Sequence, residues 1–370
     1  MIRLLIAEDS RTVQRVLQHL LVDEPNIEIV GIANDGEEAV RMCRELRPDL
    51  VTMDIFMPKM SGLEATKAIM TECPTRIVII SSMVNAPDTD FAFEAMRAGA
   101  INVIEKPLGI LSGKYNEIKT ELLRIIEDAV ETRPDAQLSW LPSIGADSPW
   151  SVVPERQKSL SPADIPVSTV LPDNVPLELI AIGGSTGAPT VIVEILSQLP
   201  SDYPSPIIVA QHISRGFASK MAEWLNSSIT LEVKIASETS VPAVGSVLVC
   251  PDDKHLKFAD RNTIQLKTPA SRGGHVPSID MLFSSVADAF GAAALGIILS
   301  GMGKDGAEGL LKMRNRKGYC IGQNEATSVV YGMNRVAYET GAVHVQRSPI
   351  GIAETLLKLA ATRRIKDAVS

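Results

Sequence analysis

The chain has 370 residues, a formal net charge of −8 and 45% hydrophobic residues. This length and composition predict a soluble protein of two or three domains. The acidic balance argues against nucleic acid or a membrane surface as the main partner. No apolar run reaches the roughly 18 residues of a membrane span, and scattered cysteines without a CxxC pair fit a reducing compartment. We therefore expect a cytoplasmic protein with no direct membrane insertion.

Short apolar segments alternate with amphipathic ones over residues 1–132, which we call the first unit. The apolar segments read RLLIAED, IEIVGIA, DLVTMDI, RIVIISS and INVIEKP, and the segments between them include SRTVQRVLQHLL and GEEAVRMCREL. Short apolar strands separated by helices predict a parallel sheet with both faces covered. The first unit is therefore expected to be a doubly wound α/β domain.

Polar side chains stand where these strands end. Glu8 and Asp9 follow the first strand, Asp54 the third, Ser81 the fourth and Lys106 the fifth. Since the carboxyl ends of parallel strands share one crevice, these groups should converge there. Neighbouring carboxylates need a cation and suit Mg²⁺, and a carboxylate beside the metal, a lysine and a hydroxyl can accept a phosphoryl group. Each acid alone could equally be a helix cap, but their joint order favours the phosphoryl-accepting site.

This arrangement resembles the response-regulator receiver family, which has a flavodoxin-like fold, over about residues 3–126. The resemblance implies that Asp54 is the phosphorylation site. It also implies that Mg²⁺ binds to Asp9, to Asp54 and to the backbone carbonyl of Phe56. Glu8 would assist the metal, directly or through water.

The same resemblance assigns two further roles and shows two departures. Lys106 would contact the phosphoryl group and precede a cis Pro107, and Ser81 would be the switch hydroxyl. Phe56 is apolar where a polar residue is usual, and Val103 replaces the usual aromatic switch residue. These departures concern dephosphorylation and switching rather than phosphorylation itself.

The segment from 133 to 176 contains eight prolines interleaved with serine and aspartate. Such a segment cannot sustain helical or ladder hydrogen bonding, so it is predicted to be a linker. It would join the first unit to a second α/β unit over residues 177–363.

The second unit opens with LELIAIGGSTGAP, an apolar strand that runs into a glycine-rich turn around Ser185. The turn satisfies G-x-S-x-G, the strand-to-helix corner that exposes a nucleophilic serine. Phosphate binding or simple helix capping would use the same residues, although Ala188 stands where a P-loop needs lysine. A nucleophilic serine also needs a base and an orienting carboxylate.

Candidates for these two groups end other apolar runs. His212 ends PIIVAQH, and Asp305 follows the strand and turn of ALGIILSGMGKDGAEGL, just before a helix. Both should therefore reach the sheet edge that carries Ser185. The chain order Ser, His, Asp differs from the α/β-hydrolase order. The other histidines belong to the first unit or lie in polar or glycine-rich segments: His19, His255, His275 and His344.

Several motifs of the second unit resemble the catalytic domain of the chemotaxis protein-glutamate methylesterases, the CheB family, over about residues 179–341. The motifs are GGSTGAP, AQHISRGFASKMAEWLN, CPDDKHL, HVPSIDMLF, SGMGKDGAEGLL and NEATSVVYGM. The resemblance implies a Rossmann-like fold in which Ser185 is the nucleophile, His212 the general base and Asp305 its orienting partner. The backbone N–H of Met302 would serve the oxyanion hole, and Thr186 would line the site.

The family pattern is not matched everywhere beside the predicted site. Ala188 stands for a usual glycine, and Ile213 with Ser214 stands for a usual Met-Pro pair. None of these differences removes a predicted catalytic group.

The resemblance implies a methylesterase that hydrolyses glutamyl methyl esters on methyl-accepting chemoreceptors, with glutamine deamidation as a second activity. A chemotaxis histidine kinase would be the phosphodonor, Mg²⁺ would serve only the first unit, and ester hydrolysis would need no cofactor. Two alternatives stay open: a response regulator whose output is binding, for example to nucleic acid, and a serine hydrolase of small metabolites. The acidic charge and the absence of a basic recognition helix count against nucleic acid.

Overall fold

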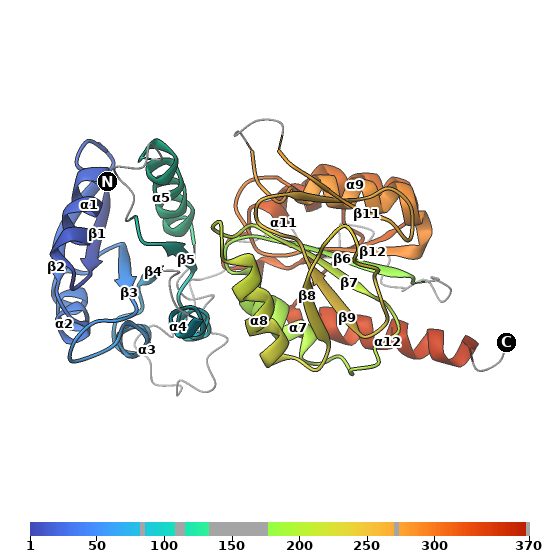
Figure 1. Ribbon diagram of the computed structural model, residues 1–370, viewed down its shortest axis with the longest axis horizontal. Helices are drawn as coiled ribbons and strands as arrows, with labels where there is room; N and C mark the ends of the chain where they lie inside the picture. Colours follow the sequence, from blue (N-terminus) through green and yellow to red (C-terminus); the bar gives the residue numbers. More distant parts are fainter. Residues whose placement is uncertain (82–85, 108–114, 133–176, 270–273, 368–370) are drawn as a thin grey trace, which may run out of the picture.

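The computed structural model describes residues 1–81, 86–107, 115–132, 177–269 and 274–367. The linker predicted for 133–176 lies outside these ranges. The described residues form two α/β units, each a parallel sheet flanked by helices (Figure 1). In the described ranges no helix combines the length and apolar character needed to cross a membrane.

The first unit has a five-stranded sheet of order β2-β1-β3-β4-β5, in which all pairs are parallel. Its strands are β1 Ile2–Ala7, β2 Ile27–Ala33, β3 Leu50–Asp54, β4 Arg76–Ser81 and β5 Asn102–Glu105. Its helices are α1 Arg11–Leu21, α2 Gly36–Leu46, α3 Gly62–Glu72, α4 Ala86–Arg97 and α5 Tyr115–Val130. The strand β3 is buried along its whole length, as expected for a central parallel strand covered on both faces.

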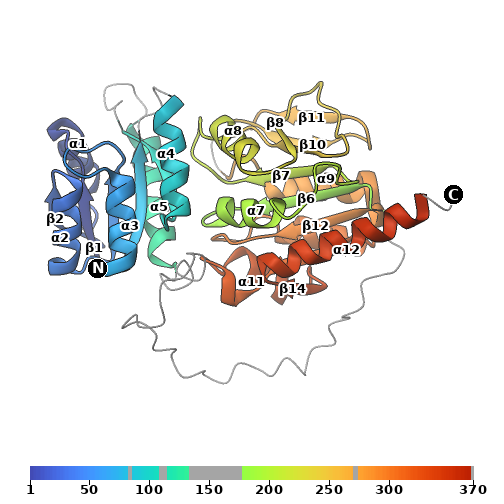
Figure 2. The same ribbon diagram turned by 90° about the horizontal axis from the view of Figure 1, so that it is seen from below.

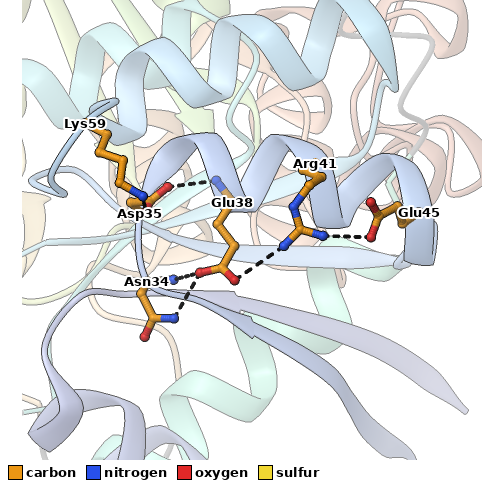
Figure 3. A network of polar contacts seen from close by, with 6 residues as sticks. All are labelled: Asn34, Asp35, Glu38, Arg41, Glu45 and Lys59. Carbon is orange, nitrogen blue, oxygen red and sulfur yellow. Dashed lines mark hydrogen bonds and ion pairs between the residues drawn. The ribbon is translucent and has the colours of Figure 1, made fainter.

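Polar contacts fix the start of α2 (Figure 3). The N-cap residue Asp35 accepts a hydrogen bond from the backbone N–H of Glu38 at 2.8 Å and pairs with Lys59 Nζ at 2.6 Å. Glu38 in turn accepts from Asn34 and pairs with Arg41 one turn along the helix. The cap satisfies an N–H that the helix itself cannot, whereas the exposed ion pairs add about 0–1 kcal/mol each.

The second unit has a seven-stranded parallel sheet of order β14-β13-β12-β6-β7-β9-β8. Its strands are β6 Leu179–Gly184, β7 Ile207–Gln211, β8 Glu232–Ile235, β9 Ser246–Val249, β12 Ala294–Ile298, β13 Tyr319–Gln323 and β14 Val345–Arg347. Successive strands after β6 lie on one side of it, and β12 to β14 lie on the other. The order therefore switches beside β6, where open α/β sheets form their binding crevice.

Helices cover both faces of this sheet, and α12 runs along it toward the C-terminus (Figure 1). They are α7 Ala188–Leu196, α8 Ala218–Ser228, α9 Ile279–Phe290, α10 Ala307–Asn315, α11 Met333–Glu339 and α12 Pro349–Asp367, with 3₁₀ turns at Gly291–Ala293 and Glu325–Thr327. A separate antiparallel hairpin joins β10 His255–Phe258 to β11 Ile264–Lys267.

The two units contact each other through α4 and α5 of the first unit (Figure 2). Phe93 of α4 stacks on Trp224 of α8 with ring centroids 5.0 Å apart and planes 17° apart. Val329 and Val330 of the second unit belong to the same apolar cluster as Ile125 and neighbouring residues of α5. The contact is therefore apolar and lies on the side of the second unit where β6 ends.

One sequence prediction is wrong. The only cis peptide bond within the described residues joins Val276 to Pro277, so the bond before Pro107 is trans. An X–Pro bond prefers trans by about 0.5–1 kcal/mol unless its surroundings impose the other isomer.

Candidate functional sites

Three carboxylates converge at the carboxyl ends of β1 and β3. One oxygen each from Glu8, Asp9 and Asp54 lies within 4.8 Å of the others. Glu8 and Asp54 are buried, whereas Asp9 is exposed and leaves the cluster open to solvent. Lys106 Nζ lies 2.8 Å from Asp54 Oδ2 and 3.0 Å from Glu8 Oε2. The predicted acidic residues and the lysine are thus in one place.

The electrostatics of this cluster show an excess of negative charge. Burial and then the charge of Asp54 raise the pKa of Glu8 to about 7, and burial raises the pKa of Asp54. Burial alone would lower the pKa of Lys106, but the hydrogen bond and charge of Asp54 and the charge of Glu8 raise it. One lysine does not neutralise three acids, and oxygen ligands on an open side suit Mg²⁺. The residues present therefore fit the predicted ion.

The remaining predicted residues of the first unit differ in their relation to this cluster. Ser81 is buried at the end of β4, and its carbonyl accepts the Lys106 N–H at 2.9 Å. Phe56 is 45% exposed and makes an edge contact with Phe91 of α4 at 5.7 Å between centroids. Val103 is fully buried in β5. The backbone N–H of Phe56 is hydrogen-bonded to Asp54, so Phe56 adjoins the acidic cluster, whereas Val103 is a core residue.

Ser185 directly follows β6 and is 3% exposed. Its N–H donates to the carbonyl of Ser300, beyond the end of β12, at 2.9 Å. A Cβ atom on Gly301 would lie 2.6 Å from Ser185 Cβ, so only glycine lets the following loop approach this closely. That approach brings the segment with Met302 against the Ser185 turn. Among the described residues, the Met302 N–H donates no hydrogen bond.

His212 follows β7, the neighbour of β6 in the sheet. Its N–H donates to the carbonyl of Gly184 at 2.9 Å, so His212 and Ser185 leave adjacent strands side by side. Its Nε2 lies 2.8 Å from Asp305 Oδ2, and its Nδ1 is buried with no hydrogen-bond partner among the described residues. The imidazole is therefore held at one nitrogen and free at the other.

Asp305 lies in a ring of donors at the N-terminus of α9. It accepts from the N–H of Ile279 at 2.8 Å, the N–H of Asp280 at 3.0 Å and Ser278 Oγ at 3.2 Å. Burial alone would raise the pKa of Asp305, but the hydrogen bond and charge of His212 and these N–H groups lower it strongly. Asp305 is thus ionised at neutral pH and can orient a histidine.

Sequence reasoning missed several polar groups that hold this site. Gln211 Nε2 donates to the carbonyls of Ser185 at 2.7 Å and His212 at 2.9 Å. Ser300 Oγ donates to the carbonyl of Thr186 at 2.7 Å, while Thr186 Oγ1 is buried without a hydrogen-bond partner in the described part of the chain. Gln211 and Ser300 were visible as polar residues that end apolar runs, and that signal could have identified them.

Helix α5 of the first unit lies near the same site. The charge of His212 acts to lower the pKa of Asp128, and the charge of Arg124 acts to lower the pKa of His275. These two α5 residues therefore lie near the site. Met302 packs against the apolar cluster that α5 shares with Val329 and Val330. A cavity of about 390 Å³ lies between the units. It is lined on one side by Met96, Arg97, Gly99 and Ala100, and on the other by Gly187, Thr190, Val193, Glu194, Ser197 and Val329.

Comparison with known proteins finds matches to family models and to relatives over most of the chain. Residues 180–356 match the family model of the CheB methylesterase, and residues 4–112 match that of the response regulator receiver domain. Protein-glutamate methylesterase/protein-glutamine glutaminase 4 of Myxococcus xanthus (strain DK1622) is 38% identical over 343 residues, which cover 93% of this chain and 92% of that protein.

One further relative and one solved structure are also similar to parts or most of the chain. Protein-glutamate methylesterase/protein-glutamine glutaminase 1 of Syntrophus aciditrophicus (strain SB) is 37% identical over 360 residues, 97% of this chain and 99% of that protein. The crystal structure of the Thermotoga maritima CheB methylesterase catalytic domain matches with a TM-score of 0.48 and 31% identity, covering 50% of this chain and 98% of that one.

Proposed function

Because the chain belongs to the CheB family of methylesterases with a receiver domain, we propose that it demethylates glutamyl methyl esters on chemoreceptors under phosphorylation control. The observation that carries the proposal is the 2.8 Å contact between His212 and Asp305 beside the Ser185 turn. Relatives bear the names of both methylesterase and glutaminase, so the proposal includes glutamine deamidation at the same site.

The chemistry follows from which atoms are free. Ser185 Oγ attacks the ester carbonyl carbon and gives its proton to His212. Because Nε2 is bound to Asp305, Nδ1 is the nitrogen that takes this proton. The oxyanion that forms faces the Met302 N–H, and preorganised donors of this kind stabilise it as charge develops.

Collapse of this intermediate completes the first half of the reaction. The ester C–O bond breaks, and methanol leaves with the proton from His212. Water then attacks the acyl-serine, again with His212 as base, and frees the glutamate and Ser185. With a glutamine substrate, ammonia leaves in place of methanol.

The first unit would control access to this site. A chemotaxis histidine kinase would phosphorylate Asp54, and Mg²⁺ would be held by Asp9, Asp54 and the Phe56 carbonyl with help from Glu8. The ion would offset the negative charge of the carboxylates and the phosphoryl group. Lys106 would contact the phosphoryl group, and Ser81 would respond to it. Helix α5 and its apolar contact with Val329 and Val330 support a model in which the unphosphorylated first unit covers the cleft.

Removal of the nucleophile tests the activity. Ser185→Ala should abolish methanol release from a methylated receptor, since no other group can form the acyl-enzyme. The variant should still take up phosphoryl groups from acetyl phosphate, because the acidic cluster is in the other unit. Free small esters assayed in parallel separate a receptor methylesterase from a metabolite hydrolase. Near-wild-type methanol release by Ser185→Ala would eliminate the assigned nucleophile.

Two further experiments test control. Asp54→Asn should fail to gain the acid-stable, base-labile phosphoryl group that the wild type gains with acetyl phosphate and Mg²⁺. A fragment that begins at Val175 should hydrolyse receptor esters about 5- to 150-fold faster than the unphosphorylated full chain, the range of a coupling of about 1–3 kcal/mol. If a well-folded fragment is no faster than the unphosphorylated full chain, the model in which the first unit covers the cleft is ruled out.

A further inference from the structure

The imidazole of His275 lies flat against the imidazole of His212. The ring centroids are 4.2 Å apart and the planes differ by 9°. The His212 side chain is only 4% exposed, whereas His275 remains exposed. His275 is thus an outer layer over one face of the proposed base.

The other contacts of His212 leave the orientation of its ring incompletely fixed. Asp305 holds one atom, Nε2, and Nδ1 has no partner among the described residues. A single hydrogen bond at the ring edge permits the ring to tilt about that bond. A parallel ring on its face opposes the tilt, because the two stacked rings lose contact when one of them turns.

One short segment holds both the base and its carboxylate partner. His275 stands three residues before Ser278, and Ser278, Ile279 and Asp280 donate to Asp305. The Ser278 N–H also donates to His255 Nδ1 at 3.0 Å, which anchors the segment to β10. The stack on His212 and the cradle around Asp305 are therefore built by the same stretch of backbone.

The charge state of His275 suits this position. Partial desolvation of the ring and then the positive charges of His212 and Arg124 lower the pKa of His275 to about 4, with Asp305 acting in the opposite direction. His275 is therefore neutral at neutral pH. When His212 takes a proton from Ser185, the neutral His275 ring therefore places no like charge beside it.

We propose that His275 is a positioning residue whose ring holds the His212 imidazole in the orientation that presents Nδ1 to Ser185. The inference rests on the proposed function, and it assigns His275 no contact with the substrate. The face of the His275 ring makes the contact with His212, so the nitrogens of His275 are not needed for this role.

The test compares three variants of the full chain: His275→Ala, His275→Asn and His275→Phe. Methanol release from methylated receptor is measured with acetyl phosphate and Mg²⁺. His275→Ala and His275→Asn should lose about 10- to 100-fold in kcat with little change in KM, the scale of a small misplacement of a catalytic group. His275→Phe should stay within a few-fold of wild type, because it restores the ring without the nitrogens. Loss in His275→Phe equal to that in His275→Ala, or no loss in either, overturns the proposal.

A second readout does not depend on the receptor substrate. A fluorophosphonate labels a serine activated by a histidine, so the rate of Ser185 labelling should follow the same order among the variants. If the wild type labels at Ser185 but releases no methanol, the proposed substrate is wrong while the labelling order still decides the role of His275. A wild type that does neither would overturn both. Unchanged Asp54 phosphorylation and unfolding temperature in each variant establish that folding is intact.

Discussion

The two candidate sites lie at the carboxyl ends of parallel strands in similar sheets. The pKa values of their buried carboxylates are shifted in opposite directions. In the first unit, Glu8 and Asp54 face each other with one lysine between them, and burial raises the pKa of both acids. In the second unit, Asp305 lies among N–H donors at the start of α9 beside His212, and its pKa is lowered.

The difference shows that strand topology decides where polar groups meet, while local donors decide their charge. A cluster of acids with raised pKa values has a deficit of positive charge, which suits a metal ion and a transferred phosphoryl group. A single acid saturated with donors stays ionised and rigid, which suits the orientation of a base. The predictions below test this contrast, starting with the largest effect.

Asp305→Asn should have the largest effect on catalysis. An amide in this position can donate to His212 Nε2, which leaves the proton on the nitrogen that should act as base. In serine-protease triads the equivalent change costs about 10⁴-fold in kcat. The measurement is methanol release under saturating receptor, with Asp54 phosphorylation as the control for folding. A loss below tenfold would mean that the donors around Asp305 do not serve the orientation of His212.

Lys106→Met should destabilise the first unit when no metal is present. Loss of one partner of a buried ion pair leaves uncompensated charge and costs about 3–5 kcal/mol. Mg²⁺ should restore part of this loss, because the ion replaces the missing positive charge. Unfolding of wild type and variant is compared in EDTA and in Mg²⁺. Equal stability in EDTA would show that the acidic cluster does not lack positive charge.

The members of both sites were predictable where they follow apolar strands. Ser185 and His212 end buried runs, and parallel strands bring such ends together. His275 and the donors for Asp305 were not predictable in this way, because their positions depend on how the segment before α9 folds over His212 and is anchored to His255. The contact between Phe93 and Trp224 joins two units, and no periodicity within either unit indicates it.

Asp280→Asn should change the pH dependence of stability. Asp280 Oδ1 accepts the Gly309 N–H at 2.7 Å, and burial and then the charge of Asp305 raise the pKa of Asp280 from 3.8 to about 6. The folded state therefore binds this proton more tightly than the unfolded state, so stability falls as pH rises from about 4 to about 6, by at most about 3 kcal/mol.

Asparagine keeps the acceptor for Gly309 and cannot ionise. The variant should therefore match wild type near pH 4 and exceed its unfolding temperature above pH 6. Asp305 gives the opposite slope, because its lowered pKa supplies stability that is lost only as pH falls below about 4. Parallel pH profiles for wild type and Asp280→Asn would contradict the charge assigned to Asp280.

The smallest expected effect concerns an aromatic contact that joins the two units. Phe93 stacks on Trp224, and an aromatic pair of this kind contributes about 0.5–1.5 kcal/mol. If that energy holds the first unit over the cleft, Phe93→Leu and Trp224→Leu should each raise methanol release by the unphosphorylated chain about 2- to 12-fold, the same energy expressed as a ratio. The double variant should gain no more than either single one, because both remove the same contact. Phe91→Leu is the matched control: Phe91 lies on the same helix but contacts Phe56 instead. Activity of the phosphorylated protein should not change, since the contact would already be open. An equal rise in phosphorylated and unphosphorylated protein would mean that the substitutions act on catalysis, and the two sites would then be coupled by some other contact.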